Sequence, residues 1–64
     1  MPSRKFAVWS WDDRNRVWMQ VSEGSERDMK AALLAKRRAA ERVLPSARFT
    51  ITPKSEPPWE APHA

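Results

Sequence analysis

At 64 residues, the chain is long enough for one domain only, and a domain of this size buries about 60% of the surface that its unfolded chain exposes. It has no cysteine, and its single histidine, His63, lies beside the C-terminus, which excludes a disulfide framework and a cysteine–histidine zinc site. The formal net charge of +4 favours acidic partners and phosphates, although a basic helix end gives the same excess of charge.

The first predicted element is a β-hairpin over residues 5–21. Residues 5–11 are rich in strand-forming Phe, Val and Trp, and residues 16–21 largely alternate between polar and apolar side chains. Residues 12–15, Asp-Asp-Arg-Asn, are typical of a turn. Because residues 22–25, Ser-Glu-Gly-Ser, interrupt the alternation, we expect the second strand to end before them.

A helix is predicted over residues 25–44. Ser25 is a suitable N-cap, acidic residues follow it in the first turn, and Pro45 ends the helix. The residues between are mainly Ala, Leu, Lys, Arg and Glu, which are good helix formers. The helical period places one set of residues on a shared apolar face: Met29, Ala32, Leu33, Ala39, Ala40, Val43 and Leu44.

Lys36 falls in the middle of this apolar face and has two interpretations. In the first, its methylene stem lies on the edge of the core while its ammonium group reaches solvent. In the second, the ammonium group points along the sheet toward a bound anion. Leu34 lies outside the face. A single exposed leucine is common in soluble proteins, but Leu34 could also belong to a contact surface.

Residues 47–52, Ala-Arg-Phe-Thr-Ile-Thr, alternate again and predict a third strand, and the proline-rich residues 53–64 predict an extended tail. These elements predict an α+β fold of ββαβ order, in which one helix packs on one face of a three-stranded sheet. The domain spans residues 1–52. If the third strand lies parallel to either of the first two, the helix is a crossover connection.

The sheet is expected to bury one row of apolar side chains from each strand. Alternation predicts that the second strand buries Val17, Met19 and Val21, and that the third buries Phe49 and Ile51. The first strand is ambiguous, because a shift of one residue in strand pairing exchanges the two faces of the sheet.

Two registers are open at the hairpin. With an even loop between the strands, Phe6 and Val8 face the helix, and the strand pairs are Val8–Met19, Phe6–Val21 and Trp9–Trp18. With a left-handed Asn15 forming a one-residue bulge, the pairing slips, so that Trp9 and Trp11 join the core. We favour the even loop because two indoles would crowd a core that faces an alanine-rich helix, although small alanines also leave room for indoles.

In the favoured register, the face of the sheet away from the helix carries an aromatic patch beside arginines. An apolar patch on a small soluble domain indicates a contact site, and Trp and Arg often dominate the binding energy of protein interfaces. We therefore predict a surface for a protein partner or for homo-oligomerisation, formed by Trp9, Trp11, Trp18, Arg16 and Arg48.

Nucleic-acid binding is the alternative function. Aromatic side chains among arginines stack on bases in proteins that bind single strands, and a basic run on a helix contacts phosphates. The candidates for phosphate contacts are Lys36, Arg37, Arg38 and Arg42. The acidic pair Asp12-Asp13 at the hairpin tip argues against insertion of the hairpin into a groove.

The tail offers a third interpretation of the patch. Pro57 and Pro58 precede Trp59, and proline packs well on an indole ring. If this segment folds back over Trp9 and Trp18, the patch is a second small core rather than a free surface. The same segment could instead dock on a neighbouring molecule.

The sequence carries no catalytic constellation. It has no cysteine and no tyrosine, and no histidine precedes His63, so its serines have no plausible histidine base. Asp12, Asp13 and Asn15 lack the spacing, turn glycine and distal glutamate of a calcium loop, and a single glycine excludes a Gly-rich phosphate loop. We expect a non-enzymatic protein without cofactor, metal or small-molecule substrate.

The longest apolar run, residues 31–35, is far shorter than the roughly 20 residues that span a bilayer, so we expect a cytoplasmic protein without a membrane segment. The hairpin with its Trp-Asp…Trp stretch, the Ala/Arg-rich helix and the final strand resemble short proteins of high-GC actinobacteria and their phages. This resemblance covers residues 5–52. It implies a small phage or bacterial accessory protein and no particular activity.

Overall fold

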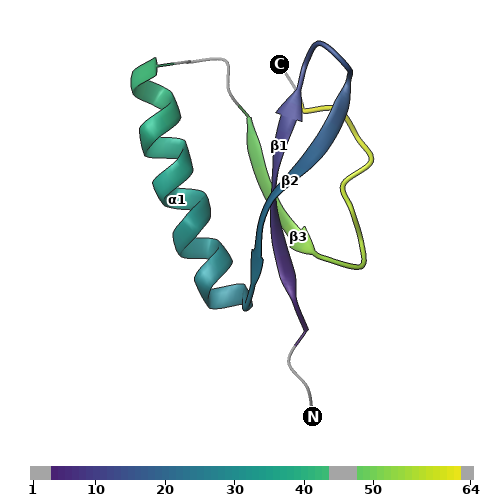
Figure 1. Ribbon diagram of the computed structural model, residues 1–64, viewed down its shortest axis with the longest axis vertical. Coiled ribbons are helices and arrows are strands. Elements are labelled where there is room, and N and C mark those ends of the chain that lie inside the picture. The colour runs from purple at the N-terminus through teal and green to yellow at the C-terminus, as the bar shows by residue number, and fades with distance from the viewer. Residues whose placement is uncertain (1–3, 44–47, 63–64) are drawn as a thin grey trace.

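The computed structural model describes residues 4–43 and 48–62, without the side chains of Glu41 and Val43. Within these residues, the chain forms an α+β fold with the elements β1 (Phe6–Asp12), β2 (Val17–Gly24), α1 (Glu26–Val43) and β3 (Phe49–Pro53). The strands form one sheet in the order β2-β1-β3 (Figure 1). The predicted fold class and ββαβ order are confirmed.

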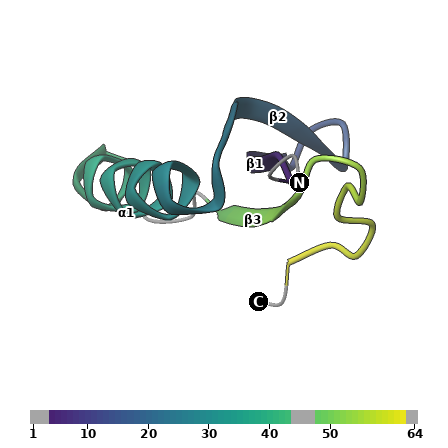
Figure 2. The same cartoon turned by 90° about the horizontal axis from the view of Figure 1, so that it is seen from below.

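β1 lies at the centre of the sheet and runs antiparallel to both of its neighbours. β3 therefore runs parallel to β2 with β1 between them, so α1 is a crossover connection between parallel strands. Figure 2 shows that α1 lies on one side of the sheet and the C-terminal tail on the other. The sheet thus has a helix-facing side and an outer side that the tail approaches.

The core lies between the sheet and α1. Its buried members are Val8, Met29 and Leu33. Four partly buried residues pack around them: Phe6, Ala32, Phe49 and Ile51. This confirms that Phe6 and Val8 on β1, and Phe49 and Ile51 on β3, face the helix.

The hairpin register differs from the prediction by two residues. Trp11 pairs with Trp18 and Asp12 with Val17, whereas Trp9 was expected opposite Trp18. The loop is residues 13–16, and it ends at Arg16, whose φ of 58° is left-handed. Because side chains alternate with a period of two, this error leaves each side chain of the loop-proximal half on its predicted face.

β2 also continues three residues beyond its predicted end. The register shifts between Val8 and Trp9, which leaves Val21 unpaired as a bulge, and residues 22–24 then pair with the start of β1. Ser25 alone connects β2 to α1. Gly24 lies close to the helix at this junction, because a Cβ there would stand 3.2 Å from the Met29 side chain. The turn-forming residues 22–25 thus form the end of β2 and its junction with α1, and the strand does not end before them.

The expectation that β2 buries its apolar row is wrong. Val17 is 46% exposed, Met19 55% and Val21 45%. Strands are about 4.8 Å apart, and a helix with its side chains is about 10–12 Å wide, so one helix covers about two strands. In Figure 2, α1 lies beside β3, whereas β2 curves away from it at the upper margin.

α1 begins at Glu26, and the predicted helix end at 44 and strand start at 47 lie outside the described residues. Leu34 is exposed, as expected. Ala39, placed on the apolar face by the helical period, is exposed as well. Pro53, assigned to the tail from the sequence, is the last residue of β3.

Candidate functional site

The outer side of the sheet brings together the tryptophans predicted to form a contact surface, but it buries one of them. Trp9 is 7% exposed, and its indole Nε1–H donates a 2.8 Å hydrogen bond to Thr52 Oγ1 on β3. Thr52 pairs with Ala7, which is two residues before Trp9 on β1 and lies on the same face of the sheet. Trp9 therefore fastens β1 to β3 and is not an accessible contact residue.

Trp11, Trp18 and Arg16 form a cluster at the hairpin end of this side. The ring centroids of Trp11 and Trp18 are 5.2 Å apart, with an interplanar angle of 63°. The Arg16 guanidinium lies 5.6 Å from the Trp11 ring, which is cation–π range, and 3.6 Å from the Asp13 carboxylate. Both tryptophans are half-buried. We call these three residues the hairpin cluster.

Arg48, the remaining residue of the predicted surface, is exposed and directly precedes β3. Its carbonyl oxygen accepts a 3.0 Å hydrogen bond from the backbone N–H of Trp11. The backbone of Arg48 thus extends the pairing of β1 with β3 to the edge of the hairpin cluster.

The tail folds back along the outer side of the sheet, as the third interpretation of the sequence anticipated. It leaves β3 through a turn in which the Lys54 N–H bonds to the Lys5 carbonyl at 2.9 Å. Farther along, the Trp18 indole Nε1–H donates a 2.8 Å hydrogen bond to the Glu60 carbonyl oxygen. This last bond ties the end of the tail to the hairpin cluster.

Two ion pairs hold the first part of the tail. Arg4 Nη2 lies 2.6 Å from Glu56 Oε2, and Lys54 pairs with Glu23 on β2. The hydrogen bond and the positive charge of Lys54 hold the pKa of Glu23 below its ordinary value. Acidic and basic side chains thus cross-link the tail to the N-terminal segment and to β2.

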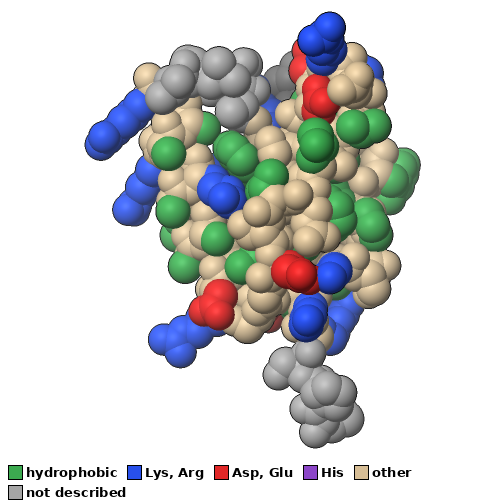
Figure 3. All heavy atoms as spheres, in the orientation of Figure 1, with side chains coloured by type: hydrophobic (Ala, Val, Ile, Leu, Met, Phe, Trp, Pro, Cys, Tyr) green, Lys and Arg blue, Asp and Glu red, His purple; other side chains and the backbone are tan. Residues whose placement is uncertain are grey.

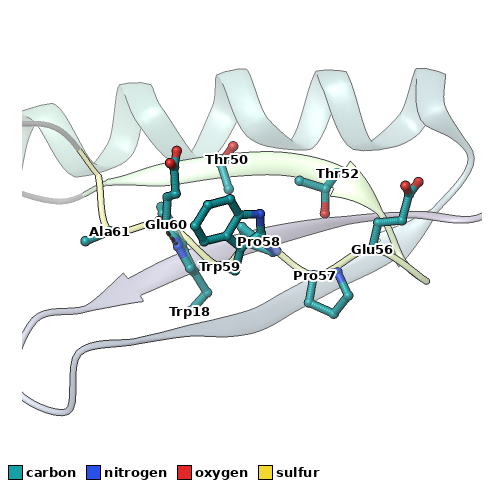
Figure 4. A pocket seen from close by; sticks show the side chains of 9 residues that line it. All are labelled: Trp18, Thr50, Thr52, Glu56, Pro57, Pro58, Trp59, Glu60 and Ala61. Atoms are coloured by element: carbon teal, nitrogen blue, oxygen red, sulfur yellow. Dashed lines mark hydrogen bonds between the residues drawn. The ribbon is translucent and has the colours of Figure 1, made fainter.

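A groove of about 570 Å³ remains between the tail and the sheet. Figure 4 shows it between the threonines of β3, Trp18 of β2 and the arching tail. Its lining residues are Trp18, Thr50, Thr52, Glu56, Pro57, Pro58, Trp59, Glu60 and Ala61. Trp59 is 86% exposed, so its ring does not fill the groove.

A second surface, which the sequence did not reveal, lies on the helix-facing side of β2. Val17, Met19 and Val21 form an exposed row that we call the β2 strip. It continues into a groove of about 340 Å³ lined by Val21, Lys36, Ala39, Ala40 and Phe49. Figure 3 shows apolar side chains at the surface over β2 and between β2 and α1. The sequence contained one indication of this surface, because a single predicted helix is too narrow to cover all three predicted strands.

The two free edges of the sheet, β2 and β3, differ in how well they are protected against pairing with another strand. On β3, Arg37 Nη2 donates a 3.4 Å hydrogen bond to the Phe49 carbonyl, and Pro53, which has no N–H, ends the strand. On β2, residues 17–22 carry no charge and no proline. Charges and prolines are the usual means of blocking an edge. The β2 edge is therefore the less protected one.

The basic helix residues proposed for phosphate contacts do not form one uniformly exposed group. Lys36 is half-buried in the groove beside the β2 strip, which agrees with a stem on the core edge, and Arg37 bonds to β3. Arg38 and Arg42 are exposed. Nucleic-acid binding by these residues stays a prediction.

Among residues 4–43 and 48–62, no group of three acidic, histidine or cysteine side chains could hold a metal ion. No helix in this described part has the length and apolar character needed to cross a membrane. Comparison with known proteins finds no family, no curated protein and no solved structure that matches this chain.

Proposed function

We propose that this chain is a non-enzymatic protein-interaction module that self-associates by pairing the β2 strands of two copies. The observation that carries the proposal is the combination of an unprotected β2 edge and the exposed β2 strip. An exposed, uncharged edge strand with apolar side chains is a template for pairing with another strand. A domain of this size also gains from association, because its own core is small.

The backbone geometry supports pairing at this edge. In an antiparallel ladder, successive residues direct their N–H and C=O groups to opposite neighbours. Since Trp11 bonds to Arg48 across the β1–β3 ladder, the groups of Asp12 are directed toward β2. The opposing Val17 then bonds to Asp12, and the next residue, Trp18, directs its groups to the free edge.

A second copy is the partner that best fits this surface. Two identical strands that pair antiparallel are related by a two-fold axis, which gives the closed, isologous interface most common in oligomers. The β2 strips of the two copies then become cross-strand neighbours on one continuous sheet. The strip has no charge that would repel its own copy.

Light scattering coupled to size-exclusion chromatography, over a range of concentrations, tests this proposal. We expect a mass twice that of the chain for the unchanged protein. Met19→Lys introduces a charge into the β2 strip and should weaken association by roughly tenfold or more, the equivalent of about 1.4 kcal/mol. Leu34→Lys is the matched control, because Leu34 is 54% and Met19 55% exposed, and Leu34 lies on α1.

The two variants also separate folding from association, since both should keep the far-ultraviolet circular dichroism of the unchanged protein. A chain that is strictly monomeric at several hundred micromolar would refute self-association. If Leu34→Lys dissociated the dimer as strongly as Met19→Lys, the interface would not lie along β2.

A further inference from the structure

The outer side of the sheet already holds a proline-rich segment, the chain's own tail. The tail crosses this side through Pro57 and Pro58, and the carbonyl of Glu60 accepts the Trp18 indole N–H at 2.8 Å. We infer that the groove formed by Trp18, Thr50 and Thr52 is a binding site for a proline-rich peptide of a partner, and that the tail occupies it in the free protein. This site is separate from the β2 strip, which lies on the opposite side.

The chemistry of the Trp18 contact is that of polyproline recognition. An extended proline-rich segment makes no internal hydrogen bonds, so its carbonyl oxygens are free to accept from a partner. Binding surfaces for such segments are aromatic-lined and exploit a conformation that is formed before binding. Trp18 provides both an aromatic surface and an N–H donor, and Trp11 holds its ring by the edge-to-face contact at 5.2 Å.

The tail fills this site incompletely, which makes it replaceable. It is fastened near its start by the exposed ion pairs Arg4–Glu56 and Lys54–Glu23, and near its end by the Trp18–Glu60 bond. Exposed ion pairs contribute little to stability. Between these points a groove of about 570 Å³ stays open, and Trp59 is 86% exposed. A peptide that displaces the tail could therefore make contacts with Trp18, Thr50 and Thr52, the sheet side of this groove, that the tail leaves unmade.

The charges indicate which proline-rich peptides would fit. Arg4 pairs with Glu56, which directly precedes the Pro57-Pro58 pair. The site therefore favours an acidic residue followed by two prolines, the pattern of residues 56–58. The net charge of +4 adds a general attraction for acidic segments.

A tethered segment competes at an effective concentration on the order of millimolar. An added peptide therefore binds with an apparent affinity reduced by the fraction of molecules whose tail is docked. Loosening the tail should raise the apparent affinity for an added peptide. This prediction distinguishes a competing tail from one that is merely a permanent part of the fold.

Nuclear magnetic resonance of the ¹⁵N-labelled full chain tests the inference. The unlabelled probe is a peptide with the sequence of residues 54–62, Lys-Ser-Glu-Pro-Pro-Trp-Glu-Ala-Pro, and the control probe replaces its prolines with alanine. The indole signal of Trp18 is assigned as the one missing from the Trp18→Phe variant. We expect the backbone amide signals of the tail, which the probe displaces, to shift saturably together with this indole signal, and to shift much less with the control.

Two full-length variants complete the test. The double variant Pro57→Ala/Pro58→Ala loosens the tail and should bind the probe about threefold more tightly or better. Trp18→Phe keeps the ring contact with Trp11 but removes the donor, and it should lose most of the affinity while retaining a dispersed spectrum.

The negative outcomes are equally specific. The binding site is refuted if neither the unchanged chain nor the loosened variant shows a shift at millimolar peptide, or if the alanine control shifts the signal equally. Equal affinity of the unchanged chain and the loosened variant would refute competition by the tail. None of these results depends on the oligomer mass, so failure here is distinguishable from failure of β2 pairing.

Discussion

Trp11 and Trp18 lie directly opposite each other across the hairpin, with ring centroids 5.2 Å apart and ring planes inclined by 63°. Trp11 bonds on its other side to Arg48, so the pair occupies a non-hydrogen-bonded position, where opposing side chains come closest. The small core between the sheet and α1 lies on the other side of the sheet from this pair. An aromatic contact therefore stabilises the end of the hairpin that α1 does not cover.

A double-mutant cycle on this pair should show favourable coupling. We expect Trp11→Ala and Trp18→Ala each to destabilise the fold, and the coupling free energy to be about 0.5–1.5 kcal/mol, as for other edge-to-face pairs. The free energy of unfolding is measured by urea titration. Trp59→Ala is the control and should stay within about 0.5 kcal/mol of the unchanged chain, because Trp59 is 86% exposed. Additive effects of the two alanines would contradict a direct contact.

The left-handed residue of the loop provides a second prediction. Arg16 has a φ of 58°, a conformation that costs an L-residue with a side chain about 1–2 kcal/mol. Arg16→Gly removes this strain together with the cation–π contact to Trp11, so the net change should be within about 1 kcal/mol. Arg16→Val increases the strain, because valine is β-branched, and it also loses the cation–π contact to Trp11. We expect valine to be less stable than glycine by about 1–2 kcal/mol.

Arg14, in the same loop without a positive φ, is the matched control for the backbone effect. There, glycine has no conformational advantage and adds disorder to the unfolded chain, so valine should be as stable as glycine or more so. Thermal melting of the four variants measures this difference. The same preference at both positions would show that the conformation of Arg16 is not strained.

The assignment of side chains to faces could be predicted from the sequence, but the strand pairing could not. Alternation alone placed Phe6 and Val8 toward the helix, and both lie there. Pairing depends on the loop, whose length is set by the Asp12 carboxylate bonding to the Arg14 and Asn15 backbone and by a left-handed Arg16. The sequence gives no indication that Arg16 is left-handed, because asparagine adopts that conformation more readily than arginine, which points to Asn15 instead.

The prediction that the second strand buries its apolar side chains was wrong for a different reason. The alternation of Val17, Met19 and Val21 shows that they share a face, but not that anything covers it. Coverage depends on the position of α1, which follows β2 after Ser25 and packs along β1 and β3. The position of the tail was predicted only as one of several alternatives, because it rests on contacts between residues as distant as Trp18 and Glu60.

The start of α1 gives a prediction that tests the junction after β2. Ser25 Oγ accepts a 3.1 Å hydrogen bond from the Asp28 backbone N–H, which is an N-cap. Ser25→Ala should lower the free energy of unfolding by about 1 kcal/mol, whereas Ser25→Asp, which keeps an acceptor, should be close to neutral. Thermal melting followed by circular dichroism measures both. Equal losses in the two variants would show that the hydroxyl does not cap the helix.

Two carboxylates should make stability depend on pH. Hydrogen bonds from the Asn15 side chain and backbone hold the pKa of Asp12 below its ordinary value, and Lys54 does the same for Glu23. A carboxyl with a lower pKa in the folded state binds fewer protons there than in the unfolded chain. Its contribution is therefore complete above the unfolded pKa and is lost as the pH falls through the folded pKa.

The melting temperature should thus be nearly constant between pH 7 and about pH 5 and should fall below about pH 4, where carboxylates titrate. Asp12→Asn and Glu23→Gln should each melt below the unchanged chain at pH 7, because each loses the charge that its partner stabilises. The variants and the unchanged chain should converge near pH 2, where all carboxyls are protonated. A difference that persisted at pH 2 would assign the loss to altered packing of the loop or the tail, rather than to ionisation.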